Sequence, residues 1–360
     1  MKIVIFGLTI SSSWGNGHAT TWRGLLRELI GRGHDVVFYE RDVPYYAAHR
    51  DMHELPGGRL ALYSEWSDMS AAATRDIADA DVAIVTSYCP DAIAASELVC
   101  NSGALRVFYD MDTPVTFSHL RSGRAVTYIP KRGLRDFDLA LSFTGGAALT
   151  ALEQELGAPE AAPLYGSVDP LLHHPVGPDD RYRSTLSYLG TYAADRQPGV
   201  DSFFIRPAMR LPHERFLLAG AQYPPDFGWT PNIHFVPHLA PAEHPAFYCS
   251  SRLTLNVTRA AMREMGWCPS GRLFEAASCG TPLISDDWQG IEDFFTPREE
   301  ILIVRNTDDV IAAMELTDAE LHRIATAARE RILAENTAAA RALDFERAIE
   351  HARKAERAAA

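Results

Sequence analysis

The sequence has no long apolar run and no excess of positive charge, and each absence excludes a class of protein. No stretch approaches the ~20 apolar residues of a membrane-spanning helix. The short apolar run 3–8 is followed by serines and carries no cleavage site, so it predicts a buried strand rather than a signal peptide. The formal net charge of −13 argues against binding to duplex nucleic acid or to a membrane surface, which would need a basic stripe.

Cysteine is also scarce and shows no pattern. The five cysteines form neither a CxxC motif nor a paired spacing. This usage is typical of reduced thiols, so we expect a cytoplasmic protein without a disulfide framework and without a bound zinc ion.

Short apolar runs alternate with amphipathic segments along nearly the whole chain. Its 360 residues, of which 47% are hydrophobic and 22% charged, fit two globular domains better than one. Apolar strands separated by helices predict parallel sheets that are covered on both faces. The expected strands are 2–8, 35–40, 81–87, 104–110 and 137–143 in the first half, and 186–192, 215–220, 252–257, 281–287 and 300–305 in the second.

A segment rich in proline, glycine and charge interrupts the alternation and predicts a domain boundary. We expect an N-terminal Rossmann-like domain over 1–170, a linker over 171–183 and a C-terminal Rossmann-like domain over 184–340. Residues 341–360 are expected to form a helix that packs back towards the N-terminal domain. Because ligands of open parallel sheets bind beyond the carboxyl ends of the strands, candidate site residues are expected in the loops there.

The segment 269–295, PSGRLFEAASCGTPLISDDWQGIEDFF, carries the strongest functional pattern. Ser270 is the expected N-cap of a helix whose free N–H groups would attract phosphate. Arg272 lies in the first turn of this helix and could make a bidentate contact with a diphosphate. Glu275, one turn further, could accept two hydrogen bonds from a ribose diol. The alternative is that both charged residues belong to a solvated helix face.

The run FEAASCGTPLISDD followed by GIEDFF resembles the donor-binding signature of group-one GT-B glycosyltransferases, and more narrowly that of their CgeB-like (spore-maturation-protein) branch. Segments that agree with this resemblance, in the expected order, are 108–116, 163–170, 188–198, 218–224 and 255–266. The resemblance implies a GT-B fold, with two Rossmann-like α/β/α domains and an interdomain cleft. It also implies transfer of a sugar from a nucleotide-diphosphate sugar to an acceptor hydroxyl.

The same resemblance implies that Glu275 holds the ribose of the donor. Many group-one enzymes carry a second glutamate eight positions earlier, near the donor sugar, where this chain has Trp267. The departure puts a retaining mechanism in doubt. The sugar and the base of the donor, UDP or GDP/dTDP, stay open.

Further donor contacts are expected in the other loops of the C-terminal domain. Gly190 would let the backbone approach a phosphate, and Arg196 could neutralise that phosphate. Arg259 is a second candidate cation, although a surface ion pair is the ordinary role of any one arginine. The family usually grips the nucleobase at the segment matching 235–241. The remaining candidates for donor binding are Tyr192, His238 and Asn256.

The N-terminal domain is expected to hold the acceptor, a small molecule or a glycan. Its glycine-rich loop follows the first strand, and the candidate acceptor-binding residues there are Gly15, Asn16 and Gly17. His18, at the start of the following helix, could be the general base, because an imidazole can take a hydroxyl proton near neutral pH. The alternative for His18 is a helix-capping or surface role.

Asp110 and Asp112 follow another strand of the same domain and are the other catalytic candidates. Either carboxylate could serve as the base, bind acceptor hydroxyls or cap the turn before Pro114. Together they imitate the metal-binding DxD motif of the other large glycosyltransferase fold. Since GT-B enzymes usually stabilise the leaving diphosphate with helix N-termini and arginines, we expect neither a bound metal nor a cofactor besides the nucleotide sugar.

Three other functions compete with this interpretation. An NAD(P)-dependent oxidoreductase is suggested by GNGHAT and by Glu40 at the end of the second strand, but the third glycine of the fingerprint is replaced by Thr20. A nucleotide-sugar epimerase of the same fold would use the same donor site. A degenerate, non-catalytic sugar or nucleotide binder is kept open by Trp267. A phosphorylase with a Schiff-base lysine is excluded, because the only lysines are Lys2, Lys131 and Lys354.

Overall fold

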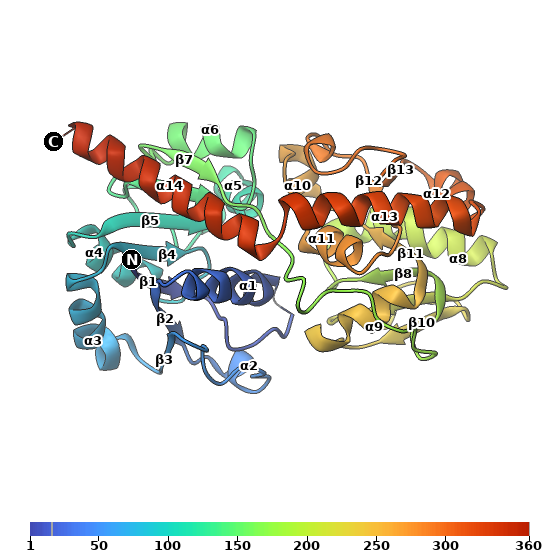
Figure 1. Cartoon of the computed structure of the whole chain (residues 1–360), viewed down its shortest axis with the longest axis horizontal. Helices are drawn as coiled ribbons and strands as arrows, with labels where there is room; N and C mark the ends of the chain where they lie inside the picture. Colours follow the sequence, from blue (N-terminus) through green and yellow to red (C-terminus); the bar gives the residue numbers. More distant parts are fainter. Residues whose placement is uncertain (16, 360) are drawn as a thin grey trace. The chain divides into compact units, whose positions relative to one another are not determined.

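The computed structural model describes residues 1–15 and 17–359, with side chains described as far as residue 355. The chain forms two compact units, each with its own parallel sheet (Figure 1). The first unit comprises Met1–Gly166 together with Ala338–Ala360, and the second comprises Ser167–Thr337. The segment 171–183, predicted as a linker, therefore lies within the second unit.

The first unit is built on a seven-stranded sheet in the order β3-β2-β1-β4-β5-β6-β7, with every pair parallel. Its strands are β1 (Lys2–Gly7), β2 (Asp35–Arg41), β3 (Arg59–Tyr63), β4 (Val82–Thr86), β5 (Leu105–Asp110), β6 (Leu139–Ser142) and β7 (Ala161–Pro163). Its helices are α1 (Gly17–Gly31), α2 (Pro44–Ala47), α3 (Trp66–Ala78), α4 (Ala92–Cys100), α5 (Thr113–Arg121), α6 (Ala147–Gln154) and α14 (Ala338–Ala359). The central strands are apolar and buried, as expected for a sheet covered on both faces.

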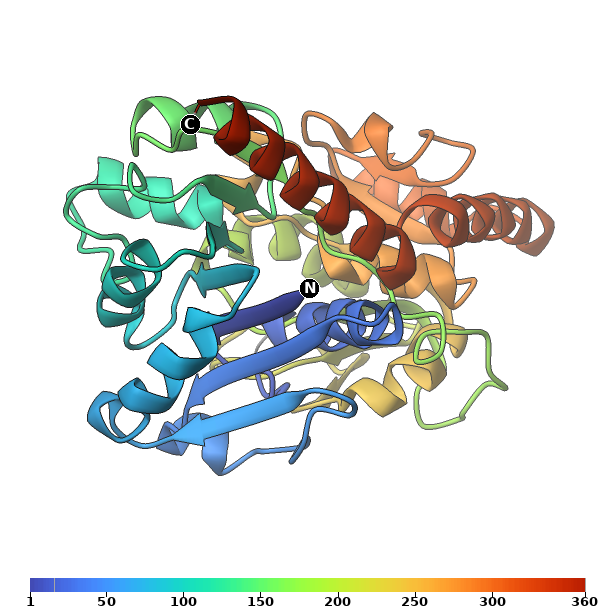
Figure 2. The ribbon, with the colours of Figure 1, turned by 60° about the vertical axis from the view of Figure 1, so that its left-hand side comes forward.

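The C-terminal helix α14 lies beside α1 (Figure 2). Its apolar side chains, among them Phe345 and Ile349, are fully buried in the same core as Trp22 and Leu26 of α1 and Ile5 of β1. The last helix of the chain therefore completes the core of the first unit, although the whole second unit precedes it in the sequence.

The second unit is built on a six-stranded sheet in the order β10-β9-β8-β11-β12-β13, again with every pair parallel. Its strands are β8 (Ser184–Leu189), β9 (Phe216–Ala219), β10 (Ile233–Val236), β11 (Ser251–Asn256), β12 (Leu283–Asp286) and β13 (Leu302–Val304). Its helices are α7 (Gln197–Val200), α8 (Arg206–Arg210), α9 (His244–Cys249), α10 (Ala260–Met265), α11 (Gly271–Ser278), α12 (Thr307–Met314) and α13 (Asp318–Glu335), with short helical turns at Ala194–Arg196, Asp201–Ile205, Pro241–Glu243 and Ile291–Asp293. A capping box between Thr317 and Glu320 starts α13.

The ten strands predicted from apolar runs are present, whereas β3, β7 and β10 are not predicted. All three of these strands lie at a sheet edge. An edge strand is only partly covered, so its sequence carries a weaker apolar signal; β3 and β10 indeed leave several side chains exposed.

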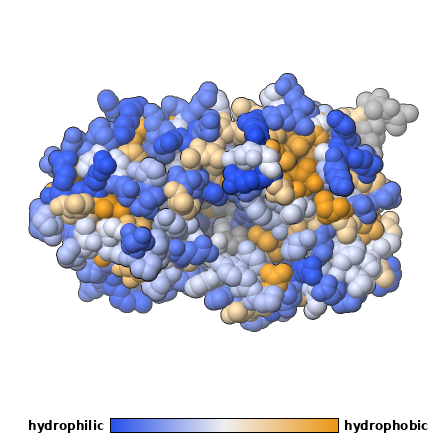
Figure 3. Space-filling model, turned by 180° about the vertical axis from the view of Figure 1, so that it is seen from behind, coloured by the Kyte–Doolittle hydropathy of each residue, from blue (hydrophilic) through white to orange (hydrophobic). Residues whose placement is uncertain are grey.

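The face of the protein drawn in Figure 3 is largely hydrophilic, with apolar patches between the polar regions. None of the helices in the described part of the chain combines the length and the hydropathy needed to span a bilayer.

Replacing Phe345 by alanine should destabilise the first unit by about 3–5 kcal/mol, because it leaves a large cavity between α14 and α1. Urea unfolding followed by circular dichroism measures this loss. Leu343→Ala, on an exposed position of the same helix, is the matched control and should change stability by no more than about 0.5 kcal/mol. Equal effects of the two substitutions would contradict a core role for α14.

Candidate functional site

Each sheet has one position at which the direction of the strand order reverses. In the first unit this topological switch lies between β1 and β4, and in the second it lies between β8 and β11. Ligands of open parallel sheets bind outside the carboxyl ends of the strands at such a point. Most of the residues predicted from the sequence follow these strands or their neighbours.

In the first unit, His18 and Asp112 form a hydrogen-bonded pair. His18 lies in the first turn of α1, and Asp112 directly precedes α5, in the turn after β5. The distance from Nε2 of His18 to Oδ2 of Asp112 is 2.7 Å, and both side chains keep a minor part of their surface exposed. A carboxylate on one ring nitrogen orients the imidazole and selects its tautomer. The arrangement therefore suits a general base.

Asp110 occupies a different environment from Asp112. It is completely buried, and one carboxylate oxygen accepts a hydrogen bond of 3.0 Å from the backbone N–H of Asp112. Burial raises the pKa of Asp110 to about 6. Asp110 thus supports the turn that carries Asp112, and its burial does not suit a direct contact with an acceptor.

The carboxylate of Glu40 fixes the first residues of the glycine-rich loop between β1 and α1 by hydrogen bonds. The buried carboxylate of Glu40 accepts hydrogen bonds from the backbone N–H groups of Ile10 and Ser11 and from the hydroxyls of Thr9 and Ser11. With four donors from the protein itself, Glu40 has no place for a ribose. This geometry removes the main support for a dinucleotide-binding oxidoreductase.

Of the predicted acceptor-binding residues, two can be placed. Gly15 has a φ of 60°, in the left-handed region that glycine adopts without strain, and Gly17 begins α1. Asn16 lies outside the described residues.

Two tyrosines that the sequence reasoning missed lie near the His18–Asp112 pair. Tyr88 follows β4 with a φ of 60°, a rare conformation for a bulky residue, and its ring centroid is 6.1 Å from that of His18. Tyr128 packs against Tyr88, with centroids 4.8 Å apart, and forms a hydrogen bond of 2.8 Å with the hydroxyl of Thr116. The position of Tyr88 after a strand was the only available signal.

In the second unit, Arg272 connects the ends of β8 and β11. Its Nε donates to the carbonyl of Leu189, and its Nη1 donates to Oδ1 of Asn256 at 2.7 Å. The guanidinium also lies over the ring of Tyr188. Gly190 lies beside it, and an added Cβ would lie 2.8 Å from Nη2 of Arg272, so a side chain there would displace the guanidinium.

Asn256 is fully buried, and its side chain also donates to the hydroxyls of Thr258 and Ser285. With both ends of its amide engaged by the protein, Asn256 positions Arg272 and is not placed to contact a donor directly.

Arg196 and Arg259 lie close to Arg272. Burial and the neighbouring charges of Arg272 and Arg259 lower the pKa of Arg196. Its Nη1 donates to the carbonyl of Thr191, while its buried Nε has no hydrogen-bond partner among the described residues. Arg259 is paired with Asp195 at 3.1 Å. These three guanidinium groups outnumber the one carboxylate paired with them, that of Asp195. They therefore make an electropositive region at the carboxyl ends of β8 and β11.

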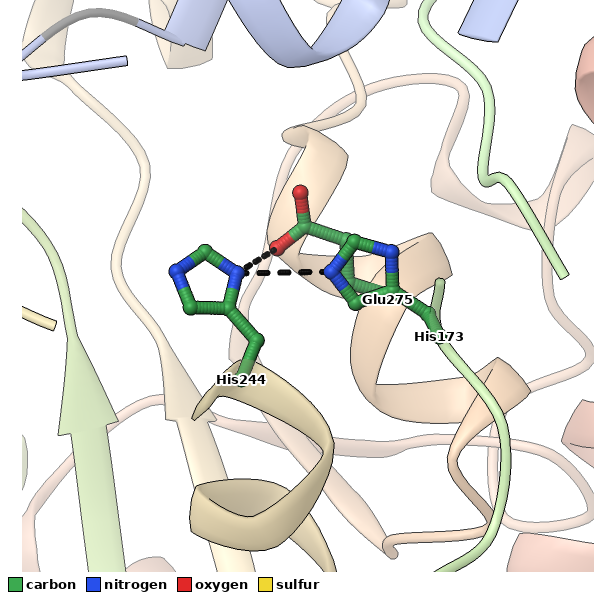
Figure 4. A group of neighbouring side chains, drawn as sticks. All are labelled: His173, His244 and Glu275. Atoms are coloured by element: carbon green, nitrogen blue, oxygen red, sulfur yellow. Dashed lines mark hydrogen bonds and ion pairs between the residues drawn. The ribbon is translucent and has the colours of Figure 1, made fainter. Parts of the chain in front are cut away.

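Glu275 projects from the second turn of α11 into a group of polar side chains (Figure 4). Its Oε2 accepts a hydrogen bond of 3.3 Å from the hydroxyl of Tyr248 and lies 3.7 Å from Nδ1 of His244. Nδ1 of His244 lies in turn 3.3 Å from Nε2 of His173. These three residues could supply ligands to a metal ion.

The charge state of this group follows from its surroundings. Burial opposes ionisation of Glu275, but the adjacent imidazoles, Arg272 and the Tyr248 hydroxyl lower the pKa of Glu275 below its usual range. Burial lowers the pKa of His244 to about 4, so this imidazole is neutral at pH 7. Glu275 is therefore an anionic acceptor beside the neutral imidazole of His244.

The other predicted donor residues take varied positions. Ser270 precedes the first residue of α11 as expected, but its side chain makes no capping hydrogen bond. Tyr192 packs edge-on against Tyr223, and His238 is half-buried after β10. Trp267, at the position of the missing glutamate, donates from its indole to Asp293 at 2.6 Å.

Comparison with known structures identifies the fold. Sucrose-phosphate synthase from Thermosynechococcus elongatus is similar with a TM-score of 0.72 and 15% identity, over 98% of this chain and 99% of that one. Anabaena Alr3699/HepE in complex with UDP and glucose has a TM-score of 0.70 and 12% identity, over 98% and 100% of the two chains. An alpha-glucosyltransferase in complex with UDP-glucose and DNA containing an abasic site has a TM-score of 0.69 and 14% identity, over 97% and 99%. The fold is therefore GT-B, and the predicted fold class is confirmed.

A family model also matches part of the sequence. Residues 196–347 match a family model described as "Glycosyl transferase-like". This segment contains Glu275, Arg272 and Arg259. No curated protein sequence matches the chain significantly.

The burial of Asp110 predicts a pH dependence of stability. Its pKa of about 6 in the folded chain exceeds the ordinary value near 3.9, so the folded state binds the proton more tightly. Ionisation therefore costs up to about 3 kcal/mol of folding free energy, and this loss develops as the pH rises from about 4 to about 6. In urea unfolding between pH 4 and 7.5, Asp110→Asn should gain stability relative to the wild type over that window.

The matched control for this measurement is Asp180→Asn, because the side chain of Asp180 is exposed. Its difference from the wild type should not change with pH. A pH-independent difference for Asp110→Asn as well would show that Asp110 is ionised in the fold without cost.

Proposed function

We propose that this protein is a glycosyltransferase that transfers a sugar from UDP-sugar to an acceptor hydroxyl. The observation that carries the proposal is the combination, in one unit, of three clustered arginines and an anionic Glu275 at the switch point between β8 and β11. The match of residues 196–347 to glycosyl transferase-like proteins supports it. The solved structures with UDP or UDP-glucose favour UDP as the nucleotide.

The second unit would bind the donor. Arg196, Arg259 and Arg272 would neutralise the diphosphate, helped by the N–H groups at the start of α11. Glu275 would accept hydrogen bonds from the ribose diol. Its Oε2 is held by Tyr248, and its Oε1 faces Gly271, whose missing side chain leaves room beside it.

The first unit would activate the acceptor. His18, oriented by Asp112, would remove the proton of the acceptor hydroxyl, whose oxygen then bonds to the anomeric carbon. The bond from that carbon to the diphosphate breaks, and the departing electron pair goes to the diphosphate oxygen near the arginines. A base on the acceptor side suits a single displacement, so we propose an inverting reaction. Trp267 in place of the second glutamate agrees with this outcome.

Several finer points belong to the same proposal. The run FEAASCGTPLISDD supports the CgeB-like branch of the class. A net charge of −13 favours a small molecule or a glycan over a nucleic acid as the acceptor. The five cysteines, none of which forms a disulfide within the described residues, favour a cytoplasmic location. Neither a cofactor nor a catalytic metal is needed for the steps above.

Binding of UDP should raise the melting temperature of the wild type by several degrees, because a ligand at a hundred times its Kd adds about 2.7 kcal/mol to the native state. Thermal unfolding with UDP, GDP and dTDP in EDTA measures this, and it tests metal independence at once. Glu275→Ala should lose the shift, whereas Glu264→Ala, an exposed glutamate of the same unit, should keep it. An equal shift in Glu275→Ala would remove Glu275 from the donor site.

His18→Ala should lower turnover by about 10²–10⁴-fold, since it removes the general base, while leaving the Kd for UDP unchanged. Asp112→Asn should lower turnover less, because the imidazole stays in place. The assay follows UDP release from UDP-glucose with water or added saccharides as acceptors. His213→Ala, at an exposed histidine, is the control. Full turnover in His18→Ala would exclude His18 as the base.

A further inference from the structure

Three potential metal ligands converge beside the proposed donor site. They are Nε2 of His173, Nδ1 of His244 and a carboxylate oxygen of Glu275, and all three atoms lie within 4.8 Å of one another. The residues come from separate parts of the second unit: His173 lies before β8, His244 begins α9, and Glu275 lies on α11. Figure 4 shows the two ring nitrogens and the carboxylate oxygen directed towards one another.

Two of the three spacings are close to those around a tetrahedral ion. Ligand atoms bound at the Zn–N distance of 2.0–2.1 Å lie about 3.3–3.4 Å apart at tetrahedral angles. The distance between the two imidazole nitrogens is 3.3 Å, and that from His244 to the Glu275 oxygen is 3.7 Å. His173 and Glu275 offer ligand atoms within 4.8 Å of each other, and binding of an ion would draw this pair together.

The ligand set and the surroundings are those of an exchangeable site rather than a structural one. Two imidazoles and a carboxylate leave one of four positions open. His173 is buried, while His244 and Glu275 remain partly exposed, which provides a path for entry. Tyr248 supports Glu275 from outside the ligand set, whereas Nδ1 of His173 has no hydrogen-bond partner among the described residues. Incomplete outer support predicts moderate affinity.

We propose that His173, His244 and Glu275 form a reversible Zn²⁺ site whose occupation weakens binding of the nucleotide. An ion on Oε2 would withdraw the negative charge with which Oε1 accepts the ribose hydrogen bonds, and this part rests on the proposed function. Zinc would thus act as an inhibitor of donor binding. This proposal departs from the expectation, drawn from the sequence, that the protein binds neither zinc nor another metal; the cysteine pattern bears only on thiolate ligands, and this site uses none.

The decisive measurement is a titration of EDTA-stripped protein with Zn²⁺ alone, in competition with a chromophoric zinc indicator. The wild type should bind one ion per chain at this site. His173→Ala and His244→Ala should each lower the affinity by at least about tenfold, the loss that even an outer partner can cause. His174→Ala is the matched control, since this adjacent exposed histidine lies outside the ligand set. Circular dichroism checks each fold, and Glu275→Gln serves as a near-isosteric ligand variant.

A second titration measures the Kd for UDP with and without saturating Zn²⁺. In the wild type and in His174→Ala, saturating zinc should raise this Kd. In His173→Ala the same zinc concentration should raise it much less, which also separates the effect from zinc bound to UDP. Equal zinc affinity in all variants would overturn the site. Zinc binding without any effect on UDP would overturn the coupling. Failure of UDP to bind in EDTA would instead refute the proposed function and the coupling, while the zinc titration still decides the site.

Discussion

The geometry of the second unit depends on the position of the Arg272 guanidinium. By donating to Leu189 and Asn256, it ties the loops after β8 and β11 to the start of α11. Because β8 and β11 flank the switch point of the sheet, this one side chain determines the spacing of the loops around the candidate donor site. A side chain at Gly190 would displace this guanidinium.

Arg272 has an electrostatic consequence as well. Its charge lies near two other arginines and near the carboxylate of Glu275. The like charges are unfavourable together, and a bound diphosphate would relieve that repulsion. The opposite charge helps Glu275 stay ionised despite its burial. The Arg272 guanidinium thus contributes to a site for an anion and also keeps Glu275 ionised as a hydrogen-bond acceptor.

In the first unit, buried carboxylates position the candidate catalytic residues in a comparable way. Glu40 holds the loop before α1, and Asp110 holds the turn before α5. These two buried acids place His18 and Asp112, which are partly exposed, within hydrogen-bond distance of each other. In both units the buried polar groups therefore position the partly exposed ones.

The sequence by itself determined the fold class, ten of the strands and the donor segment around Glu275. These features have local causes: apolar runs at strand length, glycine stops after helices, and charged residues in a first helical turn. It also proposed His18, Asp110 and Asp112, but it could not separate Asp110 from Asp112, since both follow the same strand.

Only the tertiary structure decided which candidates meet. The roles of Glu40, Asp110 and Asn256 as supports depend on burial and on partners distant in the sequence. The edge strands β3, β7 and β10 and the convergence of His173 with His244 and Glu275 had no local signal, and His173 lay in a segment predicted as a linker. Such features arise from the packing of remote segments, and a single sequence records the residue types but not the distances between them.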